Sequence, residues 1–262
     1  MLLLLAVLLC GAVAQLYIVR AAPVSGSGPE LTVTRLTNST FLGRYEATLA
    51  VVGNPQPHFH AYFPPGAASG SCEREWTTRQ ARAHDCLFAT NASPFSFKAH
   101  NGTNCLGPLV SDGVVVVGNT TGSVFGLTRD GFFVLGNLDV PHLSMPFVQL
   151  FGAFEMVVVN GVAVPSSSPK VAPRTALGVD AGGRLLLFEA DGAEKFHDGL
   201  TTAQLGLWLQ SLGAVWAINV DGGGSSTVAY PNGKLWSRPT CIDIPWPPCE
   251  RSVTTIACIT NS

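Results

Sequence analysis

The chain has 262 residues, a formal net charge of −2 and only 12% charged residues, well below the roughly 25% that is usual for soluble domains. Without a basic excess or a basic stripe, the sequence argues against nucleic acid and against an anionic membrane surface as partners. Its length suits one large domain or two small ones, with a substantial core.

The first residues have the pattern of a secretory signal. Leu2 begins a short apolar run that ends at Val13, and the small residues at positions 12 and 14 fit cleavage before Gln15. The run is too short to span a bilayer. We therefore expect residues 1–14 to be removed and the protein to act in the secretory pathway, in the Golgi lumen or as a secreted protein.

The cysteine count agrees with an oxidising compartment. Cys10 leaves with the predicted signal, and the even number that remains predicts three disulfides. Spacing typical of a zinc ribbon is missing, so the sequence predicts no metal and no other cofactor. The cysteines that remain are Cys72, Cys86, Cys105, Cys241, Cys249 and Cys258.

Asparagine sequons also suit a luminal or extracellular surface. Glycosylation is predicted at Asn38, Asn101 and Asn119. A further sequon begins at Asn91, and we expect Pro94 directly after it to make it a poor acceptor.

The first third of the chain predicts few regular elements. Residues 21–30 are rich in Pro, Gly and Ser and predict a linker. Strands are predicted at 31–36 and 45–52, and a short helix at 73–84. Residues 31–262 are expected to form a single domain.

The most apolar later segment is 147–164. Gln149, Glu155 and Asn160 interrupt it, so it predicts a buried hairpin and not a membrane-spanning helix. We expect no transmembrane segment in this chain.

Turn dipeptides separate short apolar runs from position 112 onward. Asp130-Gly131, Asn160-Gly161 and Asn232-Gly233 each favour the type I′ turn of an antiparallel hairpin. The small residues at 181–183 separate two further runs. The fold class predicted is α+β, with mostly antiparallel or mixed sheets, hairpins and few helices.

One amphipathic helix is predicted after position 200. Thr201 can cap it, and Gln204 completes a capping box. Gly213 supplies the stop, and a strand at 215–220 then leads to Asp221. The apolar face of this helix consists of Leu205, Trp208, Leu209 and Leu212.

The run 218–226 (INVDGGGSS) places an acid, three glycines and two hydroxyls at the end of that strand. Glycine lets the main chain adopt positive φ and lets a ligand approach closely. Successive amides can then form a concavity that attracts anions, with Asp221 beside it. The alternative is a tight turn with no ligand.

Arg174 and Thr175 precede another predicted strand. A guanidinium can bind phosphate in bidentate fashion and the hydroxyl adds a donor, although a lone arginine is more often a surface charge. Asp180 and Asp191 lie beside small turn residues, so turn capping is their simpler role. The alternating His58 and His60 lack a clear third metal ligand.

Several motifs resemble the phosphodiester glycosidase family. They are 173–180 (PRTALGVD), 185–192 (LLLFEADG), 217–225 (AINVDGGGS), 105–113 (CLGPLVSDG) and 146–150 (PFVQL). The likeness runs from about position 64 to 258, and the motifs fall in the right order.

The resemblance implies a hydrolase that removes terminal N-acetylglucosamine from a phosphodiester on mannose residues of lysosomal enzymes, which exposes mannose 6-phosphate. Phosphorylated high-mannose glycans of glycoproteins would be its partners, and association into a homo-oligomer stays open. It also implies the disulfide pairs Cys72–Cys105, Cys86–Cys258 and Cys241–Cys249.

Matching the motifs to this sequence implies catalytic roles for Asp221 and Arg174. Arg174 and the amides of the glycine loop would hold the phosphate, with Asp221 near the anomeric carbon. The residues implied to bind substrate are Asn91, Phe95, Thr175, Asn219, Gly222, Gly223, Gly224 and Ser225. A second catalytic acid cannot be chosen from spacing, although glycosyl transfer to water often uses two carboxylates.

The sequence departs from the family after Cys86. The family's Asn-Gly-Gly-aromatic-Phe motif reads NASPF here, so Ala92 and Ser93 replace glycines that could let the backbone approach the sugar. This favours an alternative: a catalytically impaired relative that keeps the fold and binds glycans. Animal family members continue into an EGF-like segment, a membrane span and a tail, so this chain is expected to represent the luminal domain.

Overall fold

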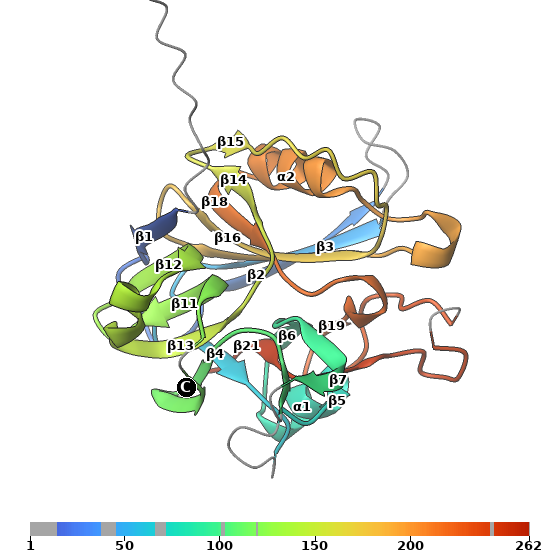
Figure 1. Ribbon diagram of the computed structural model, residues 1–262, viewed down its shortest axis with the longest axis horizontal. Coiled ribbons are helices and arrows are strands. Elements are labelled where there is room, and N and C mark those ends of the chain that lie inside the picture. The colour runs from blue at the N-terminus through green and yellow to red at the C-terminus, as the bar shows by residue number, and fades with distance from the viewer. Residues whose placement is uncertain are drawn as a thin grey trace, which may run out of the picture.

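The computed structural model describes residues 15–37, 46–65, 72–100, 103–118, 120–241 and 244–261. The predicted signal at 1–14 and the predicted glycosylation sites Asn38, Asn101 and Asn119 lie outside the described residues. Antiparallel sheets dominate the rest (Figure 1).

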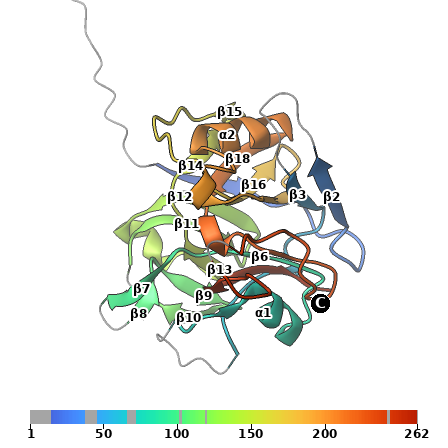
Figure 2. The same cartoon turned by 90° about the vertical axis from the view of Figure 1, so that its right-hand side faces the viewer.

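The largest sheet has seven strands and carries helix α2 (Thr202–Ser211) on one face (Figures 1 and 2). Its central strand β16 pairs with β17 on one side and with β18 on the other. In sheet order the strands are β15 (Val162–Ala163), β14 (Met156–Val159), β18 (Ala214–Asn219), β16 (Arg174–Asp180), β17 (Leu185–Ala190), β3 (Glu46–Val52) and β2 (Leu31–Thr37).

A second sheet has six strands and shares the main hydrophobic core with the first. Phe125 and Phe133 from this sheet cluster with Leu177 and Ile218 from the larger one, and all of these side chains are fully buried. In sheet order the strands are β1 (Leu16–Arg20), β12 (Phe132–Leu138), β11 (Gly122–Thr128), β13 (Phe147–Gly152), β9 (Leu109–Ser111) and β10 (Val114–Val117).

A four-stranded sheet forms the rest of the fold, with helix α1 (Thr77–Ala83) packed beside it. Its strands are β19 (Val228–Ala229), β6 (Phe88–Asn91), β21 (Ile256–Ile259) and β4 (Phe59–Tyr62). Two short ribbons flank it, β5 (Glu75–Trp76) with β20 (Ser252–Val253) and β7 (Phe95–His100) with β8 (Thr103–Cys105). The described residues also form three short 3₁₀ turns, η1 (Val140–Ser144), η2 (Glu194–Phe196) and η3 (Gly223–Ser225).

The helix predicted at 73–84 is shorter than expected. Glu75 and Trp76 pair with β20, and the helix begins only at Thr77. Strand pairing satisfies the main-chain groups that a longer helix would need, so tertiary contact overrides local propensity here.

The predicted unit of helix and strand is confirmed. The Thr201 hydroxyl accepts from the Gln204 amide at 3.2 Å, and the Gln204 side chain accepts from the Thr201 amide at 2.8 Å. Leu205 and Leu209 lie on the face of α2 that packs against the sheet, and both are fully buried. Strand β18 follows and ends at Asn219, two residues before Asp221.

Turn geometry matches two of the three predicted type I′ dipeptides. Asn160 and Gly161 both have positive φ, of 51° and 75°, as do Asn232 and Gly233, of 52° and 72°. At Asp130-Gly131 only the glycine has positive φ, of 80°. The loop there has three residues, a length that favours a type I turn followed by a left-handed glycine.

The segment 147–164 does not form one hairpin. Its first part, β13, joins the six-stranded sheet, whereas β14 and β15 form a hairpin in the seven-stranded sheet. Residues 153–155 cross from one sheet to the other. This crossing carries Glu155 to the site described below.

The residues predicted as a linker, 21–30, connect β1 to β2 without regular structure. The first two of them are packed in place, because the Ala21 amide donates to the Gly131 carbonyl at 3.0 Å and the Ala22 amide to the Gly183 carbonyl at 2.8 Å.

Three disulfides join Cys72 to Cys105, Cys86 to Cys258, and Cys241 to Cys249, which is the pairing that the family resemblance implies. The described residues form two α-helices and many antiparallel strands. The fold is therefore dominated by sheets and fits the α+β class in a coarse sense. In the part of the chain that the structure describes, no helix is long and apolar enough to cross a membrane.

Candidate active site

A cavity of about 510 Å³ opens where β16 begins and β18 ends. Three acidic and three basic side chains line it, namely Glu155, Glu194, Asp221, Lys170, Arg174 and Arg251. A concave site with converging charges is the arrangement expected for binding and transforming a polar ligand.

Asp221 is the most constrained of the acids. Its amide donates to the Ala92 carbonyl at 3.0 Å, which fixes the main chain just after β18. One carboxylate oxygen is buried without a hydrogen-bond partner among the described residues. Burial raises the pKa of Asp221 to about 6, although the Ser225 hydroxyl, the Gly222 amide and the Arg251 charge favour the ionised form. The carboxyl can therefore change protonation state near neutral pH.

The glycine loop uses most of its amides inside the protein. The Gly223 amide donates to the Pro173 carbonyl at 2.9 Å, and the Ser225 amide donates to the Gly222 carbonyl at 3.2 Å. The Gly222 amide forms a hydrogen bond with the Asp221 carboxylate. The predicted row of anion-binding amides therefore does not form in this arrangement.

The glycines serve close packing instead. A Cβ on Gly223 would lie 2.9 Å from the Glu194 carboxylate, and one on Gly224 would lie 2.5 Å from the Arg251 guanidinium. A Cβ on Gly222 would lie 2.9 Å from the Pro173 carbonyl oxygen. Hydrogen atoms at these positions let the charged side chains approach the loop.

Arg174 is held by main-chain carbonyls. Its Nε donates to the Leu200 carbonyl at 3.0 Å, and Nη2 donates to the Lys170 carbonyl at 2.8 Å. Burial lowers the pKa of Arg174, whereas Glu155 and Glu194 act in the opposite direction. Two of its five N–H donors are used in these bonds, and the fixed guanidinium lines the cavity.

Glu155 is a second acid that the motifs did not indicate. The Asn219 side-chain amide lies 3.4 Å from its Oε1, and the Asn219 main-chain amide donates to its carbonyl at 2.9 Å. Partial burial raises the pKa of Glu155, against the effects of Arg174 and Asn219. Asn219 thus lines the cavity, as its predicted role requires, and also positions this acid.

Three further cavity residues were also missed by sequence reasoning. Lys170 Nζ and Glu194 Oε1 form an ion pair at 2.8 Å, and Arg251 packs against the glycine loop from the C-terminal part of the chain. None of them belongs to a recognisable motif, because Lys170 lies in an irregular segment, Glu194 begins the short turn η2 and Arg251 precedes the short strand β20.

Asn91 and Thr175, both predicted to bind substrate, are fully buried behind the cavity. The Asn91 side-chain amide donates to the Asp221 carbonyl at 2.7 Å, and its Oδ1 accepts from the Thr175 hydroxyl at 2.8 Å and from the Thr227 amide at 3.1 Å. They support the Asp221 loop and are not among the residues that line the cavity.

The altered segment after Cys86 leaves the cavity open. Ala92 is fully buried in the main core, and the Ser93 hydroxyl faces the Pro94 and Leu106 carbonyls. Neither lines the cavity. Phe95 packs its ring 5.3 Å from that of Phe97, also away from the cavity.

His58 and His60 have a structural setting outside this site. His60 Nδ1 lies 2.7 Å from the Asp112 carboxylate, and its ring stacks on Tyr62 at 5.0 Å. Within the described ranges, no cluster of His, Cys, Asp and Glu side chains could hold a metal ion.

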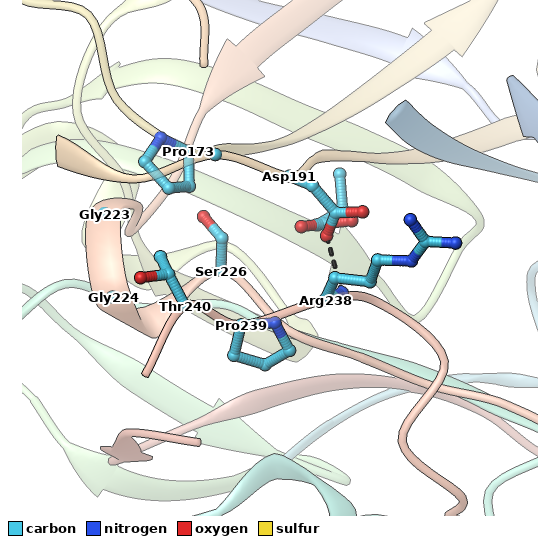
Figure 3. A pocket seen from close by; sticks show the side chains of 10 residues that line it. Pro173, Asp191, Gly223, Gly224, Ser226, Arg238, Pro239 and Thr240 are labelled. Carbon is cyan, nitrogen blue, oxygen red and sulfur yellow. Dashed lines mark hydrogen bonds between the residues drawn. The ribbon is translucent and has the colours of Figure 1, made fainter. Parts of the chain in front are cut away.

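A second, much smaller cavity of about 10 Å³ lies behind the glycine loop (Figure 3). Ser226 and Asp191 line it, and the Arg238 amide donates to Asp191 at 2.7 Å. Glu189 also lines this space, is fully buried, and has no hydrogen-bond partner for either oxygen among the described residues. Burial raises the pKa of Glu189 well above its usual value, and the neighbouring Asp191 adds to the rise.

This carboxyl leads to a prediction about stability. A pKa that is raised on folding contributes stability below the unfolded-state pKa, and that contribution is lost as the pH rises through the folded-state pKa. We expect the melting temperature of the wild type to decrease as the pH is raised from 5 to 8. In Glu189→Gln the melting temperature should depend less on pH. Calorimetric melting at both pH values measures it. Asp130→Asn, at an exposed turn, is the matched control, and an unchanged slope in Glu189→Gln would contradict the expectation.

Taken together, an acid of raised pKa, two more acids and three cations line one cavity, which suits acid–base chemistry on a charged substrate. Comparisons with known proteins agree with this class. The family model for phosphodiester glycosidases matches residues 84–260, and the chain belongs to the phosphodiester glycosidase family.

The curated relatives carry one name, N-acetylglucosamine-1-phosphodiester alpha-N-acetylglucosaminidase. The human protein is 34% identical over 74% of this chain and 42% of its own length, and the mouse protein is 32% identical over 84% and 47%. The chain thus spans less than half of the length of these relatives.

Solved structures show the same fold. The zebrafish catalytic domain of that enzyme, described as auto-inhibited by its pro-peptide, superposes with a TM-score of 0.76 at 28% identity and covers 94% of this chain and 88% of its own. A hypothetical protein from Synechocystis gives a TM-score of 0.60 at 16% identity over 88% of this chain and 62% of its own, which shows the fold alone.

Proposed function

We propose that this protein is a hydrolase that cleaves the bond between N-acetylglucosamine and phosphate in a sugar-1-phosphodiester. Its substrate is N-acetylglucosamine-phospho-mannose on the high-mannose glycans of lysosomal enzymes, and hydrolysis exposes mannose 6-phosphate. The names of the curated relatives support this substrate class. The three disulfides are consistent with the secretory-pathway lumen as its place of action.

One observation carries the proposal. Asp221 and Arg174 line the same cavity, on the ends of two strands that pair directly through Ala176 and Asn219. A carboxylate and a fixed guanidinium in one cavity suit a substrate in which a sugar carbon lies one bond from a phosphate. The sheet provides a rigid support for both groups.

The chemistry follows from the charges. Asp221, in its ionised form, takes a proton from a water that attacks the anomeric carbon, and the bond from that carbon to the phosphate oxygen breaks. If the carboxylate itself attacks, the sugar ester that it forms is then hydrolysed by water, which returns Asp221 to its starting state. The leaving phosphate monoester gains negative charge, which Arg174, Lys170 and Arg251 stabilise. Because a phosphate monoester is a weak base, it can leave without a proton from a general acid.

Glu155 completes the pair of carboxyl groups. Its raised pKa and its place beside Asn219 suit a group that exchanges a proton with water during hydrolysis. The product is free N-acetylglucosamine with a hydroxyl from water, and the remaining proton leaves with the phosphate or solvent.

Incubation of the purified protein with N-acetylglucosamine-α-phosphomannose tests the proposal. Release of free N-acetylglucosamine above that of the Asp221→Asn variant supports it, and no release above that control would overturn it. The altered segment at Ala92 and Ser93 gives no physical reason to expect inactivity, because neither side chain lines the cavity.

The pH profile gives a sharper expectation. Asp221 acts ionised and has a pKa of about 6, so kcat/KM should fall by about tenfold for each pH unit below 6. Steady-state assays between pH 4.5 and 7.5 measure this. A rate that rises on acidification would assign the reverse role, that of an acid, to this carboxyl.

A further inference from the structure

A second groove lies beside the candidate active site. It has a volume of about 550 Å³, and the residues that line it include Arg74, Trp76, Phe97 and Arg251. It is bounded by β7 and by the β5–β20 ribbon. Apart from Arg251, no residue of this lining takes part in the chemistry proposed above.

The wall of this groove carries an exposed aromatic ring. Phe97 is 65% exposed, yet contacts with neighbouring side chains hold its ring in place. The ring of Phe95 meets it edge-on at 5.3 Å, and the guanidinium carbon of Arg74 lies 4.9 Å from its centroid. A large ring that stays exposed while its neighbours hold it in place suits a flat ligand.

Arg251 joins this groove to the active site. It is the residue that lines both cavities, and its guanidinium carbon lies 5.7 Å from the Phe97 ring. Its Nε is buried without a hydrogen-bond partner among the described residues. A phosphate bound at Arg251 would therefore lie between the Asp221 carboxyl and the Phe97 ring.

A phosphodiester has two ester oxygens, and only one of them leads to the sugar beside Asp221. We propose that the other leads into this groove, and that the groove binds the mannosyl leaving group with its C–H face on Phe97. The polarised C–H bonds of a pyranose face the negative face of an aromatic ring, and the charged Glu73 and Arg74, which line the same groove, can form hydrogen bonds with its hydroxyls. This subsite rests on the proposed function.

Two substrates with different leaving groups test the subsite. N-Acetylglucosamine-α-phosphomannose fills the groove, whereas the methyl phosphodiester of N-acetylglucosamine-1-phosphate leaves it empty. We expect the wild type to prefer the mannosyl substrate in kcat/KM. Phe97→Ala should lower kcat/KM about fivefold for the mannosyl substrate and leave the methyl substrate unchanged.

Matched variants separate recognition from damage to the fold. Phe97→Tyr keeps the ring and should keep the preference. Val140→Ala removes another exposed apolar side chain, which is 70% exposed and lies on η1, between β12 and β13 of the six-stranded sheet. This variant should leave kcat/KM unchanged for both substrates. Equal effects of Phe97→Ala on both substrates, or no effect on either, would overturn the subsite.

Product binding tests the groove without turnover. By titration calorimetry, mannose 6-phosphate should bind more tightly than inorganic phosphate, and Phe97→Ala should remove that difference. Equal affinities in the wild type would overturn the subsite. If neither substrate is hydrolysed while this difference in binding is present, the proposed reaction fails and the binding groove stands.

Discussion

Asp221→Asn is expected to lower kcat/KM by about a thousandfold and to raise the melting temperature at neutral pH. The loss of activity follows from the position of the carboxyl at the end of β18, inside the cavity that also holds Arg174. Asparagine keeps the size of the side chain and removes its charge. It cannot attack a sugar carbon or take a proton from water.

The gain in stability follows from the raised pKa. Burial raises the pKa of Asp221 to about 6, so the folded protein binds this proton more tightly than the unfolded chain does. The stability contributed by the group is fully present below the unfolded-state pKa and is lost as the pH rises through about 6. Removing the charge should recover about 3 kcal/mol at pH 7.5.

Melting curves at two pH values measure this gain. At pH 7.5 the variant should melt about 8 °C above the wild type, and at pH 4.5 the gap should close because the wild-type carboxyl is then protonated. A variant that melts lower at pH 7.5, or that keeps its activity, would contradict the assignment.

Asp180 offers a matched control for the same substitution. It lies at the other end of β16, and its carboxylate accepts from the Gly182 and Arg184 amides at 2.9 Å each. Asp180→Asn therefore weakens bonds to a well-satisfied carboxylate and should lower the melting temperature. It lies outside the cavity, so kcat/KM should not change.

Local sequence signals placed the central part of this site. The capping box at Thr201 and the glycine stop at 213 fixed the limits of α2, and the apolar run after it could only continue as a buried strand. Asp221 then follows the C-terminal end of this strand. Such signals act over a few residues, which is why they can be read from sequence.

The other cavity residues depend on contacts that no local pattern encodes. In the sequence Glu155 only interrupts an apolar segment, but in the fold it occupies the crossing between two sheets. Arg251 reaches the glycine loop from a position near the C-terminal strand. Which strands pair, and in which order, decides that these charges meet.

The glycine loop shows the limit of motif chemistry. Three glycines in a row suggested free amides for an anion, yet Gly223 and Ser225 donate within the protein. The glycines instead leave space for the carboxylate of Glu194 and the guanidinium of Arg251. The positive charge of the cavity comes from arginine and lysine side chains, and the glycine loop leaves space for the charged side chains packed against it.

Replacement of Asn91 should greatly lower the stability of the fold. It is fully buried and makes three hydrogen bonds, to the Asp221 carbonyl, the Thr175 hydroxyl and the Thr227 amide. Asn91→Ala leaves buried donors and acceptors unpaired, and we expect a loss of about 4 kcal/mol in the free energy of unfolding. Urea denaturation measures it.

The carboxylate variant reports on the individual bonds. In Asn91→Asp one oxygen can still accept from Thr175 and Thr227, but an ionised carboxylate cannot donate to the Asp221 carbonyl. Its stability should therefore recover as the pH falls and the carboxyl becomes a donor, whereas that of Asn91→Ala should not. Ser93→Ala is the control, because the Ser93 hydroxyl makes only long bonds of 3.3 and 3.5 Å.

Activity shows whether this bond positions the catalytic loop. At a temperature where Asn91→Asp is fully folded, kcat/KM should fall at neutral pH, because the main chain that carries Asp221 loses its anchor, while KM changes little since Asn91 does not line the cavity. A loss of stability with wild-type kcat would mean that Asn91 supports the core alone. A joint loss of kcat and of stability means that the buried amide holds the Asp221 carboxyl in its reactive position.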